Sequence, residues 1–81
     1  MTIAVYSKPT CVQCSATYRK LEAAGLEYTT FDVTVDEKAL EIVQELGYLQ
    51  VPVVITDNDH WSGFRPDKID ELAQQCAASA A

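Results

Sequence analysis

Short apolar runs and helix-compatible stretches alternate along the first half of the chain. The run from Thr2 to Tyr6 predicts a buried strand, and the segment from Val12 to Ala24 can form a helix. Gly25 follows that helix, and glycine tolerates the left-handed conformation that is common after a helix end. The segment from Tyr28 to Val33 predicts a second strand.

A second helix is predicted after either of two capping residues, Thr34 or Asp36, and is expected to end at Gly47. Its apolar residues lie three and four positions apart and form one stripe: Ala39, Ile42, Val43 and Leu46. The charged residues of the segment fall on the other face, which we therefore expect to meet solvent.

Two short strands and a last helix complete the predicted elements. The run VVIT from Val53 to Thr56 predicts a third strand, and the turn at residues 57–59 leads to a short fourth strand at residues 60–62. The last helix is expected to begin near Pro66 or Asp67. Its apolar stripe consists of Ile69, Leu72, Ala73, Cys76 and Ala77.

The order of these elements predicts the fold class. With 81 residues the chain forms a single domain, residues 1–81, of β-α-β-α-β-β-α order. Strands that alternate with helices imply parallel pairing through right-handed crossovers, and the terminal hairpin adds an antiparallel edge. The prediction is an α/β protein with a mixed four-stranded sheet flanked by three helices.

Composition and charge exclude several classes of protein. The net charge is -6, and the six Lys and Arg residues are scattered from Lys8 to Lys68, which argues against a nucleic-acid partner. No apolar stretch approaches the ~20 residues of a membrane span, and a signal-like N-terminus is lacking, so we expect no membrane contact and a cytoplasmic location. In that reducing compartment a disulfide is expected to be transient and catalytic.

The segment KPTCVQCSA, residues 8–16, carries the candidate chemistry. It follows the first strand, which places Cys11 at the N-cap or first turn of a helix. Unpaired backbone N–H groups there favour a negative charge and should lower the pKa of the Cys11 thiol, an effect to which Lys8 can add. Cys14 lies one turn further along the same face. It is expected to be less exposed and close enough to attack a mixed disulfide at Cys11.

Two other uses of these cysteines are compatible with their number. Four possible ligands make up a Cys3His zinc set: Cys11, Cys14, Cys76 and His60. Their placement argues against zinc, because Cys76 falls in an apolar helix stripe and His60 in a predicted hairpin. The pair could also be inert core thiols, as we expect for Cys76. Redox chemistry is the favoured interpretation of Cys11 and Cys14.

Three motifs together resemble one family. The CVQC motif, GYLQVPVV at residues 47–54 and HWSGFRPDKI at residues 60–69 are similar to those of the NrdH-redoxins. These are glutaredoxin-sized members of the thioredoxin-fold superfamily that supply electrons to class Ib ribonucleotide reductase. The resemblance extends over nearly all of residues 2–72.

The resemblance implies roles for individual residues. Cys11 corresponds to the attacking thiol, Cys14 to the resolving thiol, and Pro52 to a cis-proline that faces the redox pair. A cis bond would leave the Val51 backbone free to pair with an extended substrate segment. Contacts with partners are expected from eight residues: Lys8, Thr10, Val12, Gln13, Val51, Pro52, Trp61 and Phe64.

Some of these assignments carry an alternative. Trp61 and Phe64 can each be core residues rather than docking residues. Arg65 and Asp67 are expected to fix the turn before the last helix, and His60 is expected to be a solvated residue at a sheet edge.

The resemblance also implies partners and an electron source. The expected partners are the large subunit of class Ib ribonucleotide reductase and thioredoxin reductase, an FAD enzyme that delivers electrons from NADPH. The chain itself is expected to be a monomer with no bound cofactor and no metal. In glutathione-using glutaredoxins the active-site motif resembles CPYC, and a Gly-Gly motif precedes the last helix. This chain has CVQC at the active site and SGFRP, residues 62–66, before its last helix. A glutathione-dependent glutaredoxin and an iron–sulfur or metal carrier that uses Cys11 remain the alternatives.

Overall fold

The computed structural model describes residues 2–80, and the side chains of residues 2–75. Seven elements follow one another in the predicted β-α-β-α-β-β-α order. Their bounds are β1 Ala4–Ser7, α1 Val12–Ala23, β2 Thr29–Asp32, α2 Glu37–Glu45, β3 Val53–Ile55, β4 His60–Ser62 and α3 Pro66–Ala80. The prediction of three helices and four strands is therefore confirmed.

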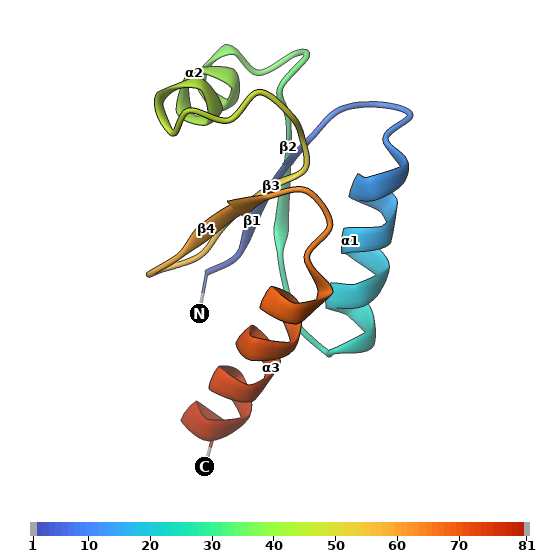
Figure 1. Cartoon of the computed structure of the whole chain (residues 1–81), viewed down its shortest axis with the longest axis vertical. Helices are drawn as coiled ribbons and strands as arrows, with labels where there is room; N and C mark the ends of the chain where they lie inside the picture. Colours follow the sequence, from blue (N-terminus) through green and yellow to red (C-terminus); the bar gives the residue numbers. More distant parts are fainter. Residues whose placement is uncertain (1, 81) are drawn as a thin grey trace.

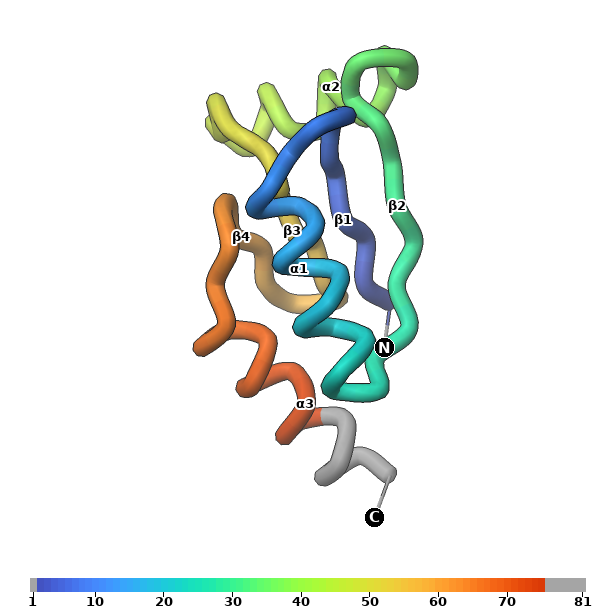
Figure 2. Tube along the Cα trace, turned by 90° about the vertical axis from the view of Figure 1, so that its right-hand side faces the viewer, coloured from blue at the N-terminus to red at the C-terminus, as the bar shows by residue number. Residues whose placement is uncertain are grey.

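The four strands form one mixed sheet in the order β2-β1-β3-β4. β1 is parallel to β2, whereas β3 is antiparallel to both β1 and β4. The expectation that β3 would continue a parallel series is wrong. Figure 2 shows the reason: α2 runs across the end of the sheet rather than back along the strands. It therefore brings the chain to β3 at the end where β2 finishes, and β3 has to run in the opposite direction.

The two faces of the sheet carry separate apolar clusters, because side chains alternate between the faces along each strand. On one face Val5 and Val54 pack with residues of α1 and α3: Leu21, Ile69 and Leu72. On the other face Tyr6 and Val53 pack with two residues of α2: Ala39 and Val43. Helices therefore cover both faces, with α1 and α3 together on one side and α2 on the other (Figure 1).

Local signals explain where α2 begins and ends. Asp36 is the N-cap, and its Oδ1 accepts a hydrogen bond of 3.1 Å from the Ala39 backbone N–H. Gly47 adopts φ +83° just after the helix. Leu46 was predicted to join the apolar stripe, but it is 36% exposed because it is the C-cap, past the turns that pack on the sheet.

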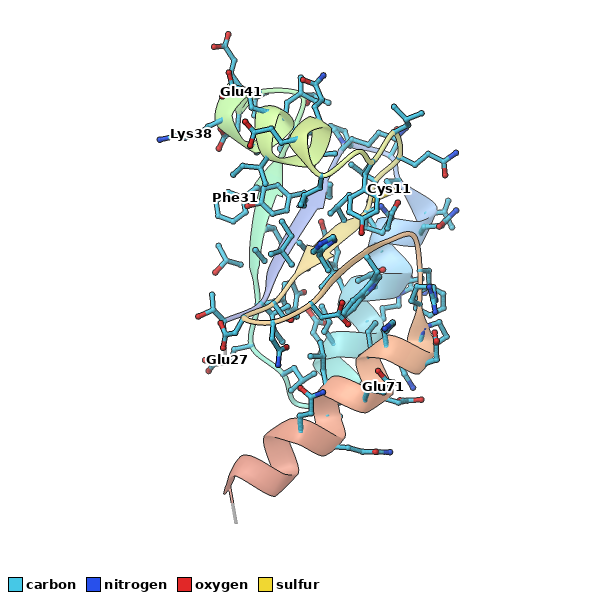
Figure 3. The ribbon with its side chains drawn as sticks, turned by 60° about the vertical axis from the view of Figure 1, so that its left-hand side comes forward. Cys11, Glu27, Phe31, Lys38, Glu41 and Glu71 are labelled. Carbon is cyan, nitrogen blue, oxygen red and sulfur yellow. A yellow bond between two sulfur atoms is a disulfide. The ribbon has the colours of Figure 1, made fainter. Side chains whose placement is uncertain are left out.

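The fold brings three loops to one end of the sheet. The loop from β1 to α1 carries Cys11, the loop from α2 to β3 carries Pro52, and the chain leaves β4 for α3 nearby. Figure 3 shows Cys11 at the end of the molecule occupied by α2, with Glu27 and Glu71 toward the opposite end. None of the helices in residues 2–80 combines the length and the apolarity that crossing a membrane requires.

Candidate active site

Cys11 and Cys14 are joined by a disulfide bond, so the structure contains the pair in its oxidised form. Their Cα atoms are 5.2 Å apart, within the usual range for a disulfide. Cys14 is only 2% exposed, whereas Cys11 is partly exposed at the surface. The predicted difference in exposure between the two cysteines is therefore confirmed, and a partner can reach Cys11 first.

Cys11 is the N-cap residue of α1, as the sequence predicted. Its Sγ accepts a hydrogen bond of 3.2 Å from the backbone N–H of Cys14. After reduction the same N–H and the helix dipole would stabilise a thiolate at Cys11. The first turn of α1 contains no acidic residue that would oppose this effect.

The residue before the nucleophile has an uncommon backbone conformation. Thr10 has φ +55°, in the left-handed region that β-branched residues rarely adopt. Its Oγ1 donates a hydrogen bond of 2.7 Å to the Pro9 carbonyl. This turn leads the chain from β1 into α1 and sets the position of Cys11 at the helix end. Lys8 and Thr10, both predicted partner contacts, are exposed beside it.

The loop before β3 lies against the sulfur pair. The Val51–Pro52 peptide bond is cis, which confirms the expectation from the resemblance. Cys11 Sγ lies 4.0 Å from the carbonyl oxygen of Val51, and the Pro52 carbonyl accepts a hydrogen bond of 2.7 Å from the Gly63 N–H. Pro52 itself is fully buried, so this segment can offer a partner the backbone of Val51 rather than the proline ring.

Gln13 connects the CVQC motif to the loop after β4. Its side-chain Oε1 accepts a hydrogen bond of 3.2 Å from the backbone N–H of Phe64. The same oxygen lies 3.4 Å from the place where a Cβ on Gly63 would be, and Gly63 has φ +85°. That distance is an ordinary van der Waals contact, so glycine is favoured here by the positive φ rather than by a lack of space. Gln13, predicted as a partner contact, has this internal role as well.

The two aromatic candidates differ in their surroundings. Trp61 is 4% exposed and belongs to the cluster between the sheet and helices α1 and α3. The interpretation of Trp61 as a docking side chain is therefore corrected in favour of the core alternative. Phe64 is 36% exposed at the start of the loop that leads to α3, so it remains available to a partner.

A groove of about 620 Å³ opens beside Cys11, between the N-terminus of α1, the helix α2 and the loop before β3. Its lining includes the apolar residues Val33, Leu40 and Val43 and the charged residue Lys8. Val12 and Leu49 border it with exposures of 84% and 98%. Sequence reasoning missed Leu49, because a single apolar residue in a loop is common on protein surfaces and does not by itself indicate a docking site.

A charged pair, Arg65 and Asp67, stabilises the turn before α3. The Arg65 guanidinium makes two hydrogen bonds with the Asp67 carboxylate, of 3.1 Å and 2.9 Å, as expected for a pair that holds the turn. Hydrogen bonding from Arg65 lowers the pKa of Asp67. Within the described side chains, no group of three or more His, Cys, Asp and Glu could hold a metal ion. The side chain of Cys76 lies outside the described residues.

Comparisons with known proteins agree on the family. The glutaredoxin family model matches residues 3–61. The glutaredoxin-like protein NrdH of Escherichia coli (strain K12) is 42% identical over 72 residues, which are 89% of this chain and 89% of that protein. NrdH of Salmonella typhimurium is 40% identical over 72 residues, which are again 89% of this chain and 89% of that protein. The solved structure of Escherichia coli NrdH-redoxin has a TM-score of 0.86 and covers 89% of this chain and 95% of its own. That protein is described as having a thioredoxin-like activity profile.

The cysteine pair lies at a helix N-terminus and faces the loop with Pro52 at the end of a mixed sheet. This arrangement is suited to thiol–disulfide exchange. The fold and the pair thus define a thioredoxin-fold oxidoreductase. At 40–42% identity to NrdH proteins across most of its length, the chain belongs to the NrdH-redoxins of the glutaredoxin family.

The exposure and hydrogen bonding of the sulfurs predict unequal reactivity. In the reduced protein, Cys11 should be alkylated at least about tenfold faster than Cys14 at neutral pH, because thiolate stabilised at a helix N-terminus is the reacting form. Iodoacetamide labelling followed by peptide mass spectrometry over a series of pH values measures both rates. Faster labelling of Cys14 would reverse the roles assigned to the two sulfurs.

Proposed function

We propose that this chain is a dithiol electron carrier that reduces the large subunit of class Ib ribonucleotide reductase. The observation that carries the proposal is the asymmetry of the sulfur pair. Cys11 is partly exposed, and its Sγ accepts a hydrogen bond of 3.2 Å from the Cys14 backbone N–H, while Cys14 is only 2% exposed. One sulfur is placed for attack on a partner, and the other is placed to react only after that attack.

The exchange proceeds in two steps that balance. The Cys11 thiolate attacks one sulfur of the partner disulfide, the partner's S–S bond breaks, and its other sulfur leaves as a thiolate. Cys14 then loses its proton and attacks Cys11 Sγ, which releases the second partner sulfur. The partner has gained two electrons, and the chain is left with the Cys11–Cys14 disulfide seen in the structure.

Thioredoxin reductase is proposed as the enzyme that reduces the carrier again, with electrons passing from NADPH through its FAD. Two facts support this choice over glutathione. The chain has CVQC and SGFRP at the positions where glutathione-using glutaredoxins have motifs that resemble CPYC and Gly-Gly. Its relative from Escherichia coli is described as having a thioredoxin-like activity profile. The carrier needs no cofactor of its own, because the electrons reside on its two sulfurs.

The proposed cycle also sets the cellular conditions. A dithiol reductant has to be returned to its reduced form after each turnover, which requires a compartment with a supply of NADPH. We therefore propose that the chain works in the cytoplasm, as a monomer whose partners take turns at the groove beside Cys11.

A comparison of electron donors tests the proposed reductant. Oxidised protein is mixed with NADPH and thioredoxin reductase in one series, and with NADPH, glutathione and glutathione reductase in the other. NADPH oxidation should depend on the chain in the first series and stay at the background rate in the second. Efficient turnover with glutathione alone would identify a glutathione-dependent glutaredoxin instead.

Replacing Leu49 with serine should weaken partner docking without affecting the fold. The side chain is 98% exposed at the rim of the groove, so we expect a free-energy change of unfolding within about 0.5 kcal/mol. The KM for a protein disulfide should rise about three- to tenfold, because an apolar contact of one side chain is lost. Steady-state kinetics with thioredoxin reductase and insulin measures the change, and Leu40→Ser provides a comparison at another residue that lines the groove. An unchanged KM would remove Leu49 from the docking surface.

A further inference from the structure

Two contacts made by side chains connect the loop beside the groove to β4. We call residues 48–51 the docking loop. It joins α2 to β3 at the end of the sheet where α1 begins (Figure 1). It includes the exposed Leu49 and places the Val51 carbonyl 4.0 Å from Cys11 Sγ. The position of this loop therefore decides what a partner meets beside the reactive sulfur.

The first attachment is a contact between Tyr48 and His60. The Tyr48 hydroxyl lies 2.6 Å from His60 Nδ1, and the two rings meet edge to face with centroids 5.6 Å apart. His60 is exposed at the first position of β4, while Tyr48 is half-buried against the cluster that contains Val43 and Val53. When Nδ1 carries no proton, it accepts a hydrogen bond from the Tyr48 hydroxyl.

The second attachment lies on the other side of Leu49. The Ser62 hydroxyl donates a hydrogen bond of 3.1 Å to the carbonyl of Gln50. The docking loop is not itself part of a strand or helix. The side chains of β4 thus hold it at two points, one before and one after its exposed apolar residue.

We propose that Tyr48 and His60 are positioning residues, whose contact holds the docking loop in the conformation that receives protein disulfides. A loop released from β4 would present Leu49 and the Val51 backbone in many orientations, and a partner would have to order it on binding. A small disulfide makes no use of the loop and needs only access to Cys11. The contact should therefore set the preference for protein over small-molecule disulfides. This inference rests on the proposed role in reducing protein disulfides.

The test measures the rate constants of the prereduced protein with two probes, insulin and the small disulfide dithiobis-nitrobenzoate. Tyr48→Phe keeps the packed ring and removes the hydroxyl, and His60→Ala removes the acceptor. Each should lower the rate constant with insulin about five- to tenfold, as expected for the loss of one hydrogen bond. The rate constant with dithiobis-nitrobenzoate should change less than about twofold. The double variant should resemble either single variant, because both remove the same contact.

Two further variants separate positioning from general destabilisation. His60→Asn returns an acceptor to the position of Nδ1 and should recover most of the insulin rate with Tyr48 present. Asn58→Ala changes an exposed residue of the same hairpin and should leave both rates unchanged.

Equal losses with both probes would show that the contact only supports the fold and would overturn the proposal. Unchanged insulin rates, or single effects that multiply in the double variant, would also overturn it. An oxidised C-terminal cysteine peptide of ribonucleotide reductase serves as a third probe. Wild-type protein that reduces insulin but not this peptide would contradict the proposed function alone, since positioning is measured on insulin.

Discussion

Replacing Cys14 with serine should convert the carrier into a trap for its partner. The partly exposed Cys11 keeps the hydrogen-bond donor of its thiolate, because the donor is the backbone N–H of residue 14 and not the side chain. The first attack on a partner disulfide therefore survives. The second attack is lost, since serine cannot displace the partner from Cys11, and the mixed disulfide should accumulate. Non-reducing electrophoresis and mass spectrometry detect the complex after mixing with the oxidised large subunit of ribonucleotide reductase.

The matching variant gives the opposite result. Cys11→Ser removes the only sulfur of the pair that a partner can reach, because Cys14 is 2% exposed. This variant should form no complex, and its disulfide reductase activity should fall to the background rate. Cys76→Ser is expected to behave like the wild type in both assays. Equal trapping by the Cys11→Ser and Cys14→Ser variants, or trapping that requires Cys76, would contradict the assigned roles.

Replacing Leu21 with alanine should cause a large loss of stability. Leu21 is fully buried in α1, in the cluster that joins the sheet to α1 and α3. Removing its outer carbons leaves a cavity and costs about 2–5 kcal/mol, a large part of the roughly 5–15 kcal/mol that stabilises a typical domain. For a domain of this size the melting temperature should fall by at least about 10 °C.

Urea unfolding followed by fluorescence measures this change, because Trp61 is the single tryptophan and is buried in the same cluster. Leu21→Met nearly conserves the volume and should cost less than about 1.5 kcal/mol. Arg19→Ala alters an exposed residue of the same helix and should be nearly neutral. A Leu21→Ala protein as stable as the Arg19→Ala protein would show that this cluster does not hold α1 to the sheet.

Local sequence signals predicted the elements and the reactive pair. Asp36 as an N-cap and Gly47 after α2 are local features, because each depends on a few neighbouring residues. The N-cap position of Cys11 likewise follows from a strand and a helix that are joined by a short loop, residues 8–11. The cis bond at Pro52 was predicted by family resemblance rather than by local chemistry.

The direction of β3 could not be predicted in the same way. It depends on the angle at which α2 crosses the sheet, and that angle follows from packing Ala39 and Val43 against Tyr6 and Val53. These contacts join residues that are far apart in the sequence. The helix–strand alternation that favoured parallel pairing carries no information about the crossing angle.

The burial of Trp61 could have been predicted from the sequence. His60, Trp61 and Ser62 alternate between polar and apolar, as expected for a strand with one buried face. That alternation indicates that Trp61 is buried and His60 is exposed, and both residues are so placed in the structure. The contact of His60 with Tyr48 was not predictable, since the docking loop reaches β4 only once the sheet has formed.

Ribonucleotide reduction in a purified system tests the central claim most directly. The assay contains class Ib ribonucleotide reductase, a ribonucleotide substrate, NADPH and thioredoxin reductase, with this chain as the only dithiol carrier. Our account predicts that deoxyribonucleotide formation requires the chain, rises with its concentration to saturation, and stays at background with Cys11→Ser. Turnover that is equally fast without the chain, or that begins only when glutathione is added, would contradict it.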